Sequence, residues 1–148
     1  MKRLFLFSIL LAGVIVTVSA CDKNDDYNPS LITESLKSFI NTSYNNARIV
    51  GTDYERGLLK IEIIHEKKEK DLYFENGQWQ YTEWDVRATD LPAAVTAAIA
   101  GTEYASYRID DADYIQKSSG DYYLIELEQG NHEVRLSITP QGVLLKYS

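Results

Sequence analysis

Hydrophobic residues recur with a helical period at two places in the chain. The first set is Ile32, Leu36, Phe39 and Ile40, and the second is Leu91, Val95, Ala98 and Ile99. Each set is spaced i, i+4, i+7 and i+8, so its members lie on one face of an α-helix. Turn and capping residues, 28–30, precede the first helix, whereas Pro92 stands early in the second and Gly101 marks its end. The pattern therefore predicts two amphipathic helices.

After each predicted helix the period changes to two, which is typical of half-buried strands. The inward positions are Leu59, Ile61, Ile63, Leu72 and Phe74 in the first half, and Tyr123, Ile125, Leu127, Val134, Leu136 and Ile138 in the second. Hairpin connections are predicted at residues 67–70 and 129–131, with tight turns at 76–77 and 141–142. Closing strands follow at residues 78–83 and 143–147.

Residues 44–54 and 104–114 share five identities at one offset of sixty. The matched pairs are Tyr44/Tyr104, Arg48/Arg108, Ile49/Ile109, Asp53/Asp113 and Tyr54/Tyr114. A period of this length indicates a duplicated supersecondary unit, with the motif supplying the first strand of each copy. Ile109 and Tyr114 are five positions apart, so both can reach the core only across a bulge. An irregularity is therefore predicted around Gly51 and Asp111, and a structural role such as turn capping is expected for Asp53 and Asp113.

This succession predicts an α+β protein, a tandem repeat of one helix followed by about four antiparallel strands. The expected divisions are a signal peptide at 1–20, an acidic tether at 21–29, and repeats at 30–87 and 88–148. The 128 residues from Cys21 onward are enough to bury a core without a disulfide or a metal. Because no proline-rich or glycine-rich linker separates the repeats, we expect them to share one fold unit.

The first twenty residues have the features of a secretory signal. Lys2 and Arg3 precede a mostly apolar run, residues 4–18, that is shorter than the roughly twenty residues of a membrane span. Residues 18–21, Val-Ser-Ala-Cys, resemble the bacterial lipobox, in which cleavage occurs before a cysteine that carries lipid. Cys21 is the only cysteine in the chain, which favours acylation over a free or disulfide-bonded thiol. We therefore expect a lipid anchor on the outer membrane, facing the periplasm or the cell surface.

Charge narrows the range of partners. Without residues 1–20 the chain has thirteen basic and twenty-two acidic residues, a net charge of −9, which disfavours binding to nucleic acid. The run at 22–26, Asp-Lys-Asn-Asp-Asp, is either a solvated spacer or a signal for the cell surface, since it resembles the acidic export signal of some Gram-negative lipoproteins. A protein or peptide of the cell envelope remains the expected partner.

Several stretches together resemble the PepSY-like family of secreted bacterial proteins. They are Trp79 and Trp84 before Asp90-Leu91-Pro92-Ala93-Ala94-Val95, residues 104–114, residues 122–127 and residues 142–145. The resemblance implies both helices on one face of a continuous curved antiparallel sheet, as in the similar beta-lactamase inhibitor protein. It also implies action by binding, because related modules occur in propeptides that inhibit peptidases. It brings no catalytic residues with it.

The residue types that catalysis needs do not form a recognisable motif. His65-Glu66-Lys67-Lys68-Glu69 has glutamate where a zinc-protease motif has its second histidine, and His132 has no neighbours at metal-ligand spacing. Both histidines are expected at strand ends or hairpins in contact with water. Asp110, Asp111 and Asp113 lack the spacing of a calcium loop and suggest solvated turn carboxylates. We therefore predict a protein that is not an enzyme, with no metal and no cofactor.

The aromatic residues divide between core and surface. Trp79 and Tyr81, two positions apart, are expected to share the buried face of a strand. Alternation places another set on the open face of the sheet, opposite the helices: Tyr73, Tyr122, Lys60, Glu62, Glu126, Arg135 and Lys146. Tyrosine with interspersed charge is typical of a recognition surface, and equally of a solvated sheet face.

Three functions are compatible with these features. The leading hypothesis is a lipid-anchored binding module of the cell envelope, a protein or peptidase inhibitor acting through the open sheet face. The alternative is a structural or accessory subunit of an envelope complex without inhibitory activity. A hydrolase is the third possibility, and it would require a deep pocket with converging carboxylates.

Overall fold

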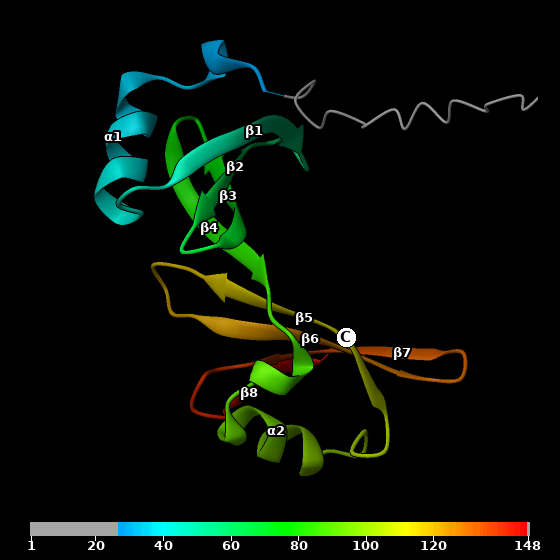
Figure 1. Cartoon of the computed structure of the whole chain (residues 1–148). Helices are drawn as coiled ribbons and strands as arrows, with labels where there is room; N and C mark the ends of the chain where they lie inside the picture. The colour runs from blue at the N-terminus through cyan, green and yellow to red at the C-terminus, as the bar shows by residue number, and fades with distance from the viewer. Residues whose placement is uncertain (1–26, 148) are drawn as a thin grey trace, which may run out of the picture.

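A computed structural model describes residues 27–147 as two α-helices on a single eight-stranded antiparallel sheet (Figure 1). The strands are hydrogen-bonded in chain order from β1 to β8. The N-terminal half comprises η1 (Pro29–Leu31), α1 (Glu34–Ser43), β1 (Arg48–Glu55), β2 (Leu58–His65), β3 (Lys68–Glu75) and β4 (Gln78–Asp85). The C-terminal half comprises η2 (Ala88–Asp90), α2 (Ala93–Ala100), β5 (Arg108–Gln116), β6 (Tyr122–Gln129), β7 (His132–Ile138) and β8 (Leu144–Tyr147). The predicted α+β class and antiparallel pairing are confirmed.

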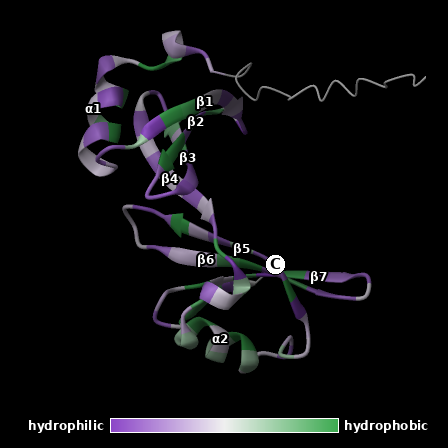
Figure 2. Cartoon of the chain, in the orientation of Figure 1, coloured by the Kyte–Doolittle hydropathy of each residue, from purple (hydrophilic) through white to green (hydrophobic). Residues whose placement is uncertain are grey.

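The two helices begin and end differently. Thr33 caps α1, because its hydroxyl accepts the N–H of Leu36. Pro92 precedes α2, and Gly101 ends it with its N–H bonded to the last carbonyls of the helix. Figure 2 shows α1 as largely hydrophilic and α2 as pale to hydrophobic, in keeping with the many alanines of α2. These small side chains let the turn at Gly142 approach closely: a Cβ there would lie 2.6 Å from the carbonyl oxygen of Ala94.

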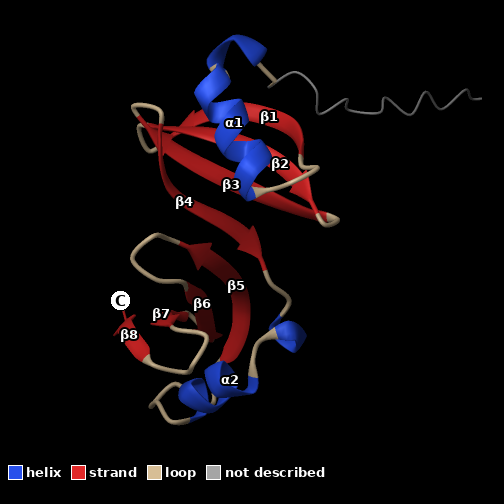
Figure 3. Cartoon of the chain, turned by 90° about the vertical axis from the view of Figure 1, so that its left-hand side faces the viewer, coloured by secondary structure: helices blue, strands red, loops and turns tan. Residues whose placement is uncertain are grey.

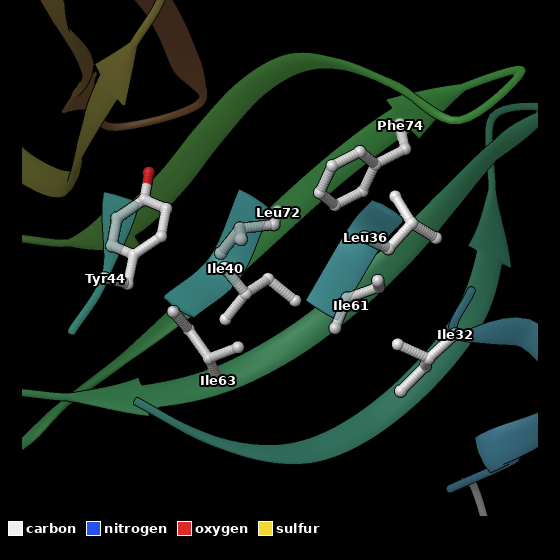
Figure 4. Close-up of a cluster of buried hydrophobic side chains, with 8 residues drawn as sticks. All are labelled: Ile32, Leu36, Ile40, Tyr44, Ile61, Ile63, Leu72 and Phe74. Atoms are coloured by element: carbon white, nitrogen blue, oxygen red, sulfur yellow. The ribbon is translucent and has the colours of Figure 1, made fainter. Parts of the chain in front are cut away.

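Each helix covers a core of its own. Figure 4 shows the N-terminal cluster, which consists of Ile32, Leu36, Ile40, Tyr44, Ile61, Ile63, Leu72 and Phe74. The C-terminal cluster consists of Leu91, Val95, Ile99, Ala112, Ile125, Leu127, Leu136 and Ile138. Nearly all of these side chains come from the predicted helix stripes and inward strand positions, so the period of the sequence located most of the core.

Both helices lie on the same face of the sheet. Figure 3 looks onto α1 where it crosses the first strands. The β4–β5 register then carries the alternation into the second half, because Thr82 pairs with Gln116 and both side chains meet the α1 side. The Tyr44 hydroxyl, on the residue that ends α1, lies 2.7 Å from Thr82 Oγ1 and donates to Gln116 Oε1 at 2.9 Å. This buried tyrosine thus joins the two halves.

Lys70 reinforces the same junction. Its side chain points to the helix side of β3, and the residue is 7% exposed. The ammonium lies 4.3 Å from the ring centroid of Trp84 and 5.4 Å from that of Tyr44. Burial lowers the pKa of Lys70. His65 is a strand end as predicted, but its ring packs edge-on against Tyr44, whereas His132 is exposed at the start of β7.

The two predicted bulges are confirmed. The register of β1 on β2 shifts between Ile49 and Gly51, and that of β5 on β6 shifts between Ile109 and Asp111. At Gly51 the carboxylate of Glu62 lies over the backbone, where a Cβ would be 2.1 Å from its Oε2. Glycine therefore makes room for that side chain.

Two details of the predicted strands are wrong. The turn lies at Glu66 and Lys67, both with positive φ, and β3 already begins at Lys68. A further bulge opposite Phe74 lets Trp79 pair with that residue and Tyr81 pair with Tyr73. Trp79 consequently packs on the helix side, whereas Tyr81 faces the opposite side.

We expect Tyr44→Phe to destabilise the protein by about 1–2 kcal/mol, because the buried partners Thr82 and Gln116 lose the hydroxyl between them. Urea unfolding followed by tryptophan fluorescence measures the change. Tyr54→Phe is the matched control, since Tyr54 is 63% exposed, and it should change stability by less than about 0.5 kcal/mol. Equal midpoints for wild type and Tyr44→Phe would contradict a bridging role.

Candidate functional site: the helix-free face of the sheet

The face of the sheet opposite the helices carries the charged side chains of the central strands. We call it the helix-free face. Its central residues are Lys60, Glu62, Asp71, Tyr73, Tyr81, Glu83, Asp85, Asp111, Asp113, Ile115, Tyr122, Leu124, Glu126 and Arg135. They alternate with the core residues along each strand, so the same pleat that fills the two cores also sets this surface.

A hollow of about 420 Å³ crosses the middle of the helix-free face. It is lined by Arg56, Glu83, Asp111, Asp113, Leu124, Glu126 and Arg135. Arg56 belongs to the β1–β2 turn and Arg135 to β7, so the hollow draws on both halves of the chain. A smaller pocket of about 190 Å³ adjoins it and shares Glu83; Asp71 and Asp85 are among its other walls.

Five of the acids that line this hollow and the smaller pocket beside it lie close together, and we call them the acidic floor: Asp71, Glu83, Asp85, Asp111 and Asp113. Asp85 and Asp113 are direct partners in the β4–β5 ladder. Burial, and then the nearby charges of Asp111, Glu83 and Asp85, raise the pKa of Asp113 to about 7. Burial also raises the pKa of Asp71 to about 6, opposed in part by Lys60. Burial and the crowding of these carboxyl groups thus keep Asp113 protonated to a higher pH than an ordinary aspartate.

The basic groups of the face are already paired with acids. Lys60 Nζ lies 2.9 Å from Glu62, 3.8 Å from Glu55 and 3.9 Å from Asp71. The rim of the hollow carries two further pairs, Arg56 with Glu55 at 3.2 Å and Arg135 with Glu126 at 2.7 Å. The hollow therefore presents an acidic floor between two arginines.

Aromatic rings form a second feature beside the acids. Tyr73 and Tyr81 stack with their ring centroids 4.3 Å apart and an interplanar angle of 16°. Lys117 Nζ lies 5.2 Å from the Tyr81 ring centroid and 5.8 Å from that of Tyr122. Tyr73 is only 2% exposed, and burial raises its pKa above the usual value.

The structure gathers some of the sequence-predicted site residues and separates others. Lys60 with Glu62, and Glu126 with Arg135, form ion pairs on the helix-free face. Tyr122 is half-buried beside Lys117, and Lys146 is exposed on β8, opposite Ser137. Tyr73 faces the predicted side, but the expectation that it is open to a partner is wrong, because Tyr81 covers it. Cys21 lies outside the described residues.

Sequence reasoning missed the acidic floor. Asp71, Glu83 and Asp85 were not singled out, and Asp111 and Asp113 were expected in a turn. Both of those residues lie in β5, where Asp111 Oδ1 accepts the N–H of Ala112 at the bulge. Alternation would have placed Asp71 and Glu83 on the open face. The meeting of Asp85 and Asp113, however, depends on the β4–β5 register, which the sequence pattern leaves open.

Within residues 27–147 no group of three or more His, Cys, Asp or Glu side chains is arranged to hold a metal ion. In the same part of the chain, no helix has the length and hydropathy needed to cross a membrane.

We expect stability to fall as pH rises from about 4 to 7, since the folded state keeps a proton on Asp113 that the unfolded chain has released. Asp113→Asn should therefore stabilise the protein at pH 8 by about 1–2 kcal/mol, after allowance for solvent screening. The gain should shrink as the pH is lowered towards 4. Thermal unfolding across this range measures it, with Asp90→Asn, at an exposed residue paired with Arg87, as the control. A gain independent of pH would contradict the assignment.

Solved structures resemble the fold described above. A BLIP-like protein from Bacteroides fragilis has a TM-score of 0.70 at 22% identity, covering 78% of this chain and 84% of its own. A DUF2874 family protein from Bacteroides ovatus has a TM-score of 0.67 at 24% identity, with coverage of 78% and 85%. A protein from Bacteroides eggerthii described as one of "putative periplasmic proteins" has a TM-score of 0.66 at 17% identity, with coverage of 78% and 87%. At these identities the likeness concerns the fold.

Sequence comparison adds a family. No curated protein matches the chain. One family model, described as "Putative beta-lactamase-inhibitor-like, PepSY-like", matches residues 68–146, which is more than half of the chain. The match includes β3, β4 and most of the C-terminal half, and with it most of the acidic floor of the hollow. The chain belongs to the PepSY-like, beta-lactamase-inhibitor-like family.

Proposed function

We propose that the protein is a lipid-anchored binding module of the cell envelope that holds another protein against its helix-free face. The observation that carries this proposal is the hollow of about 420 Å³ shared by both halves. It is concave, it combines carboxylates with two arginines and an apolar side chain, and it is built on rigid strands. Such a surface suits recognition of a partner by shape and charge.

Charge indicates what the partner presents. The floor of the hollow is acidic, and its arginines are placed at the rim in pairs with Glu55 and Glu126. A basic loop or strand end would replace the repulsion among these carboxylates by attraction, which supports a cationic contact surface on the partner. Inhibition of an enzyme is one outcome of such binding, by analogy with the beta-lactamase-inhibitor-like description of the family; a peptidase is the enzyme class that the PepSY resemblance implies.

We also infer that the two halves are copies of one unit, residues 30–87 and 88–148. The order of a helix followed by four strands occurs in each, and the bulges at Gly51 and Asp111 occupy the same place in the first strand. The hollow then lies across the junction of the copies. Both copies therefore contribute walls to the hollow, and neither copy alone would form it.

One observation favours the accessory-subunit alternative. Val143, Leu144 and Leu145 are 56%, 41% and 56% exposed beside the outer edge of β8. At the opposite edge of the sheet the N–H of Asn28 donates to the side-chain hydroxyl of Thr52 in β1, so the chain passes close to that strand. An uncovered apolar edge suits strand addition to a larger assembly, with no role for the hollow.

Reversing a charge in the hollow should distinguish partner binding through the hollow from the accessory-subunit function. We expect Glu126→Lys to lower recovery of the partner from envelope extracts by about tenfold or more, because like charges then face a basic partner. Glu103→Lys is the control, since it makes the same change of charge on an exposed residue after α2. Recovery that is unchanged by Glu126→Lys but lost in Leu145→Lys would favour the accessory-subunit function instead.

The anchor is tested separately. Mass spectrometry of the membrane-extracted protein should give a chain that begins at Cys21 and is heavier than the polypeptide by three acyl chains and a glycerol, as the lipobox resemblance implies. Cys21→Ser should release the protein from the membrane fraction. An unmodified Cys21 in membrane-bound protein would contradict lipid anchoring while leaving the binding face untouched.

A further inference from the structure

Large hydrophobic side chains are exposed where the chain enters the N-terminal half, beside β1 and far from α2 (Figure 1). Tyr27 is 43% exposed and Tyr54 is 63% exposed. Tyr54 also lines a hollow of about 370 Å³, and Leu31, Leu36, Gly57, Phe74 and Gly77 are among its other walls. We call Tyr27, Leu31, Tyr54 and the mouth of this hollow the end patch. It is separate from the helix-free face, because Leu36 and Phe74 belong to the core under α1.

The structure holds these groups together. The N–H of Asn28 donates to Thr52 Oγ1 at 2.8 Å and fixes the entry of the chain against β1. Leu31, in the single turn of η1, then reaches the same hollow as Tyr54 near the end of β1. The turns at Gly57 and Gly77 complete the mouth. The end patch is therefore a built surface and not a scatter of single exposed residues.

The tether determines which surface is within reach. Six peptide steps separate Cys21 from Tyr27. Fully extended, they span at most about 20 Å. A chain acylated at Cys21 therefore keeps Tyr27, the part of the end patch next to the tether, within that distance of the lipid. Figure 1 shows the first described residues, in blue, beside β1 and at the opposite end of the molecule from α2.

The chemistry of the end patch suits a lipid headgroup layer. Tyrosine carries an apolar ring and a polar hydroxyl, and it is enriched where membrane meets water. The net charge of −9 argues against ionic attraction to anionic lipids, so contact would rest on the tyrosines and Leu31. Apart from the lipid, the contact is too small to bind a membrane by itself, since stable anchoring needs more than one signal.

We propose that the end patch lies on the membrane interface beside the acylated cysteine, and so orients the domain with its C-terminal half away from the bilayer. This inference rests on the lipid anchor of the proposed function. Docking there would leave the walls of the large hollow that come from β4 to β7, from Glu83 to Arg135, open to a partner, with Arg56 nearest the bilayer because it shares its turn with Gly57. The lipid anchor and the end patch together would then fix how the domain is oriented on the membrane, as well as where the protein is located.

Fluorescence quenching in vesicles tests the orientation. Because acylation uses the only native cysteine, Asn76→Cys at the mouth of the hollow gives a single site for a fluorophore, and Leu145→Cys near the C-terminus gives the control. The acylated proteins are reconstituted into phosphatidylethanolamine vesicles with a headgroup-bound nitroxide lipid. We expect quenching at position 76 to exceed that at position 145 by about threefold or more, because interfacial contact brings a group within about 10 Å of the headgroups.

A second variant separates contact from mere nearness to the tether. Tyr27→Ser combined with Tyr54→Ser, in the protein labelled at position 76, should reduce the quenching at 76 towards the value at 145. Circular dichroism checks that this double variant is folded. Equal quenching at 76 and 145, or no effect of the double variant, would overturn the inference. The partner pull-down with Glu126→Lys reports on the binding face alone, so failure of one test is distinguishable from failure of the other.

Discussion

The pairing of β4 with β5 is the contact on which the rest of the structure depends. Only four residue pairs form this ladder, from Thr82 with Gln116 to Asp85 with Asp113. They convert two helix-covered sheets into one continuous sheet and keep the alternation of faces in phase across the join. A slip of one residue would move Thr82 or Gln116 away from Tyr44 and expose one core to water. The buried tyrosine therefore specifies the register as well as stabilising it.

The same pairing accounts for the character of the helix-free face. Because the β4–β5 register keeps both cores on the helix side, Glu83, Asp85 and Asp113 lie together on the helix-free face. Burial and the repulsion from the neighbouring carboxylates there raise the pKa of Asp113 to about 7. Carboxylates held in this way cost stability to the isolated protein at neutral pH. A fold that tolerates such repulsion at its centre is typical of a surface whose charge is used in binding. If this face binds a partner as proposed, stability and recognition oppose each other at the junction of the two halves.

Local patterns predicted much of this fold because local rules determine it. Helical spacing identified Leu36 and Ile40, and period two identified Ile61 and Ile125, since burial requires an apolar stripe in either element. The five-residue spacing of Ile109 and Tyr114 even located a bulge. No spacing in the sequence predicted the bulge opposite Phe74, so Tyr81 was assigned to the wrong face. The helix-free face was harder to predict. The burial of Tyr73 and the pairing of Asp85 with Asp113 depend on neighbouring strands and not on local sequence.

Carboxylate footprinting measures binding through the helix-free face residue by residue. Exposed acids are coupled to an amine with a carbodiimide, in the free protein and in the protein bound to its captured partner, and the modified residues are quantified by mass spectrometry. Binding through the helix-free face should protect Asp111 and Glu126 in the complex and leave the labelling of Glu34 unchanged, because the Glu34 side chain is 89% exposed on α1. Protection of Glu34 with unchanged labelling of Asp111 and Glu126 would contradict it.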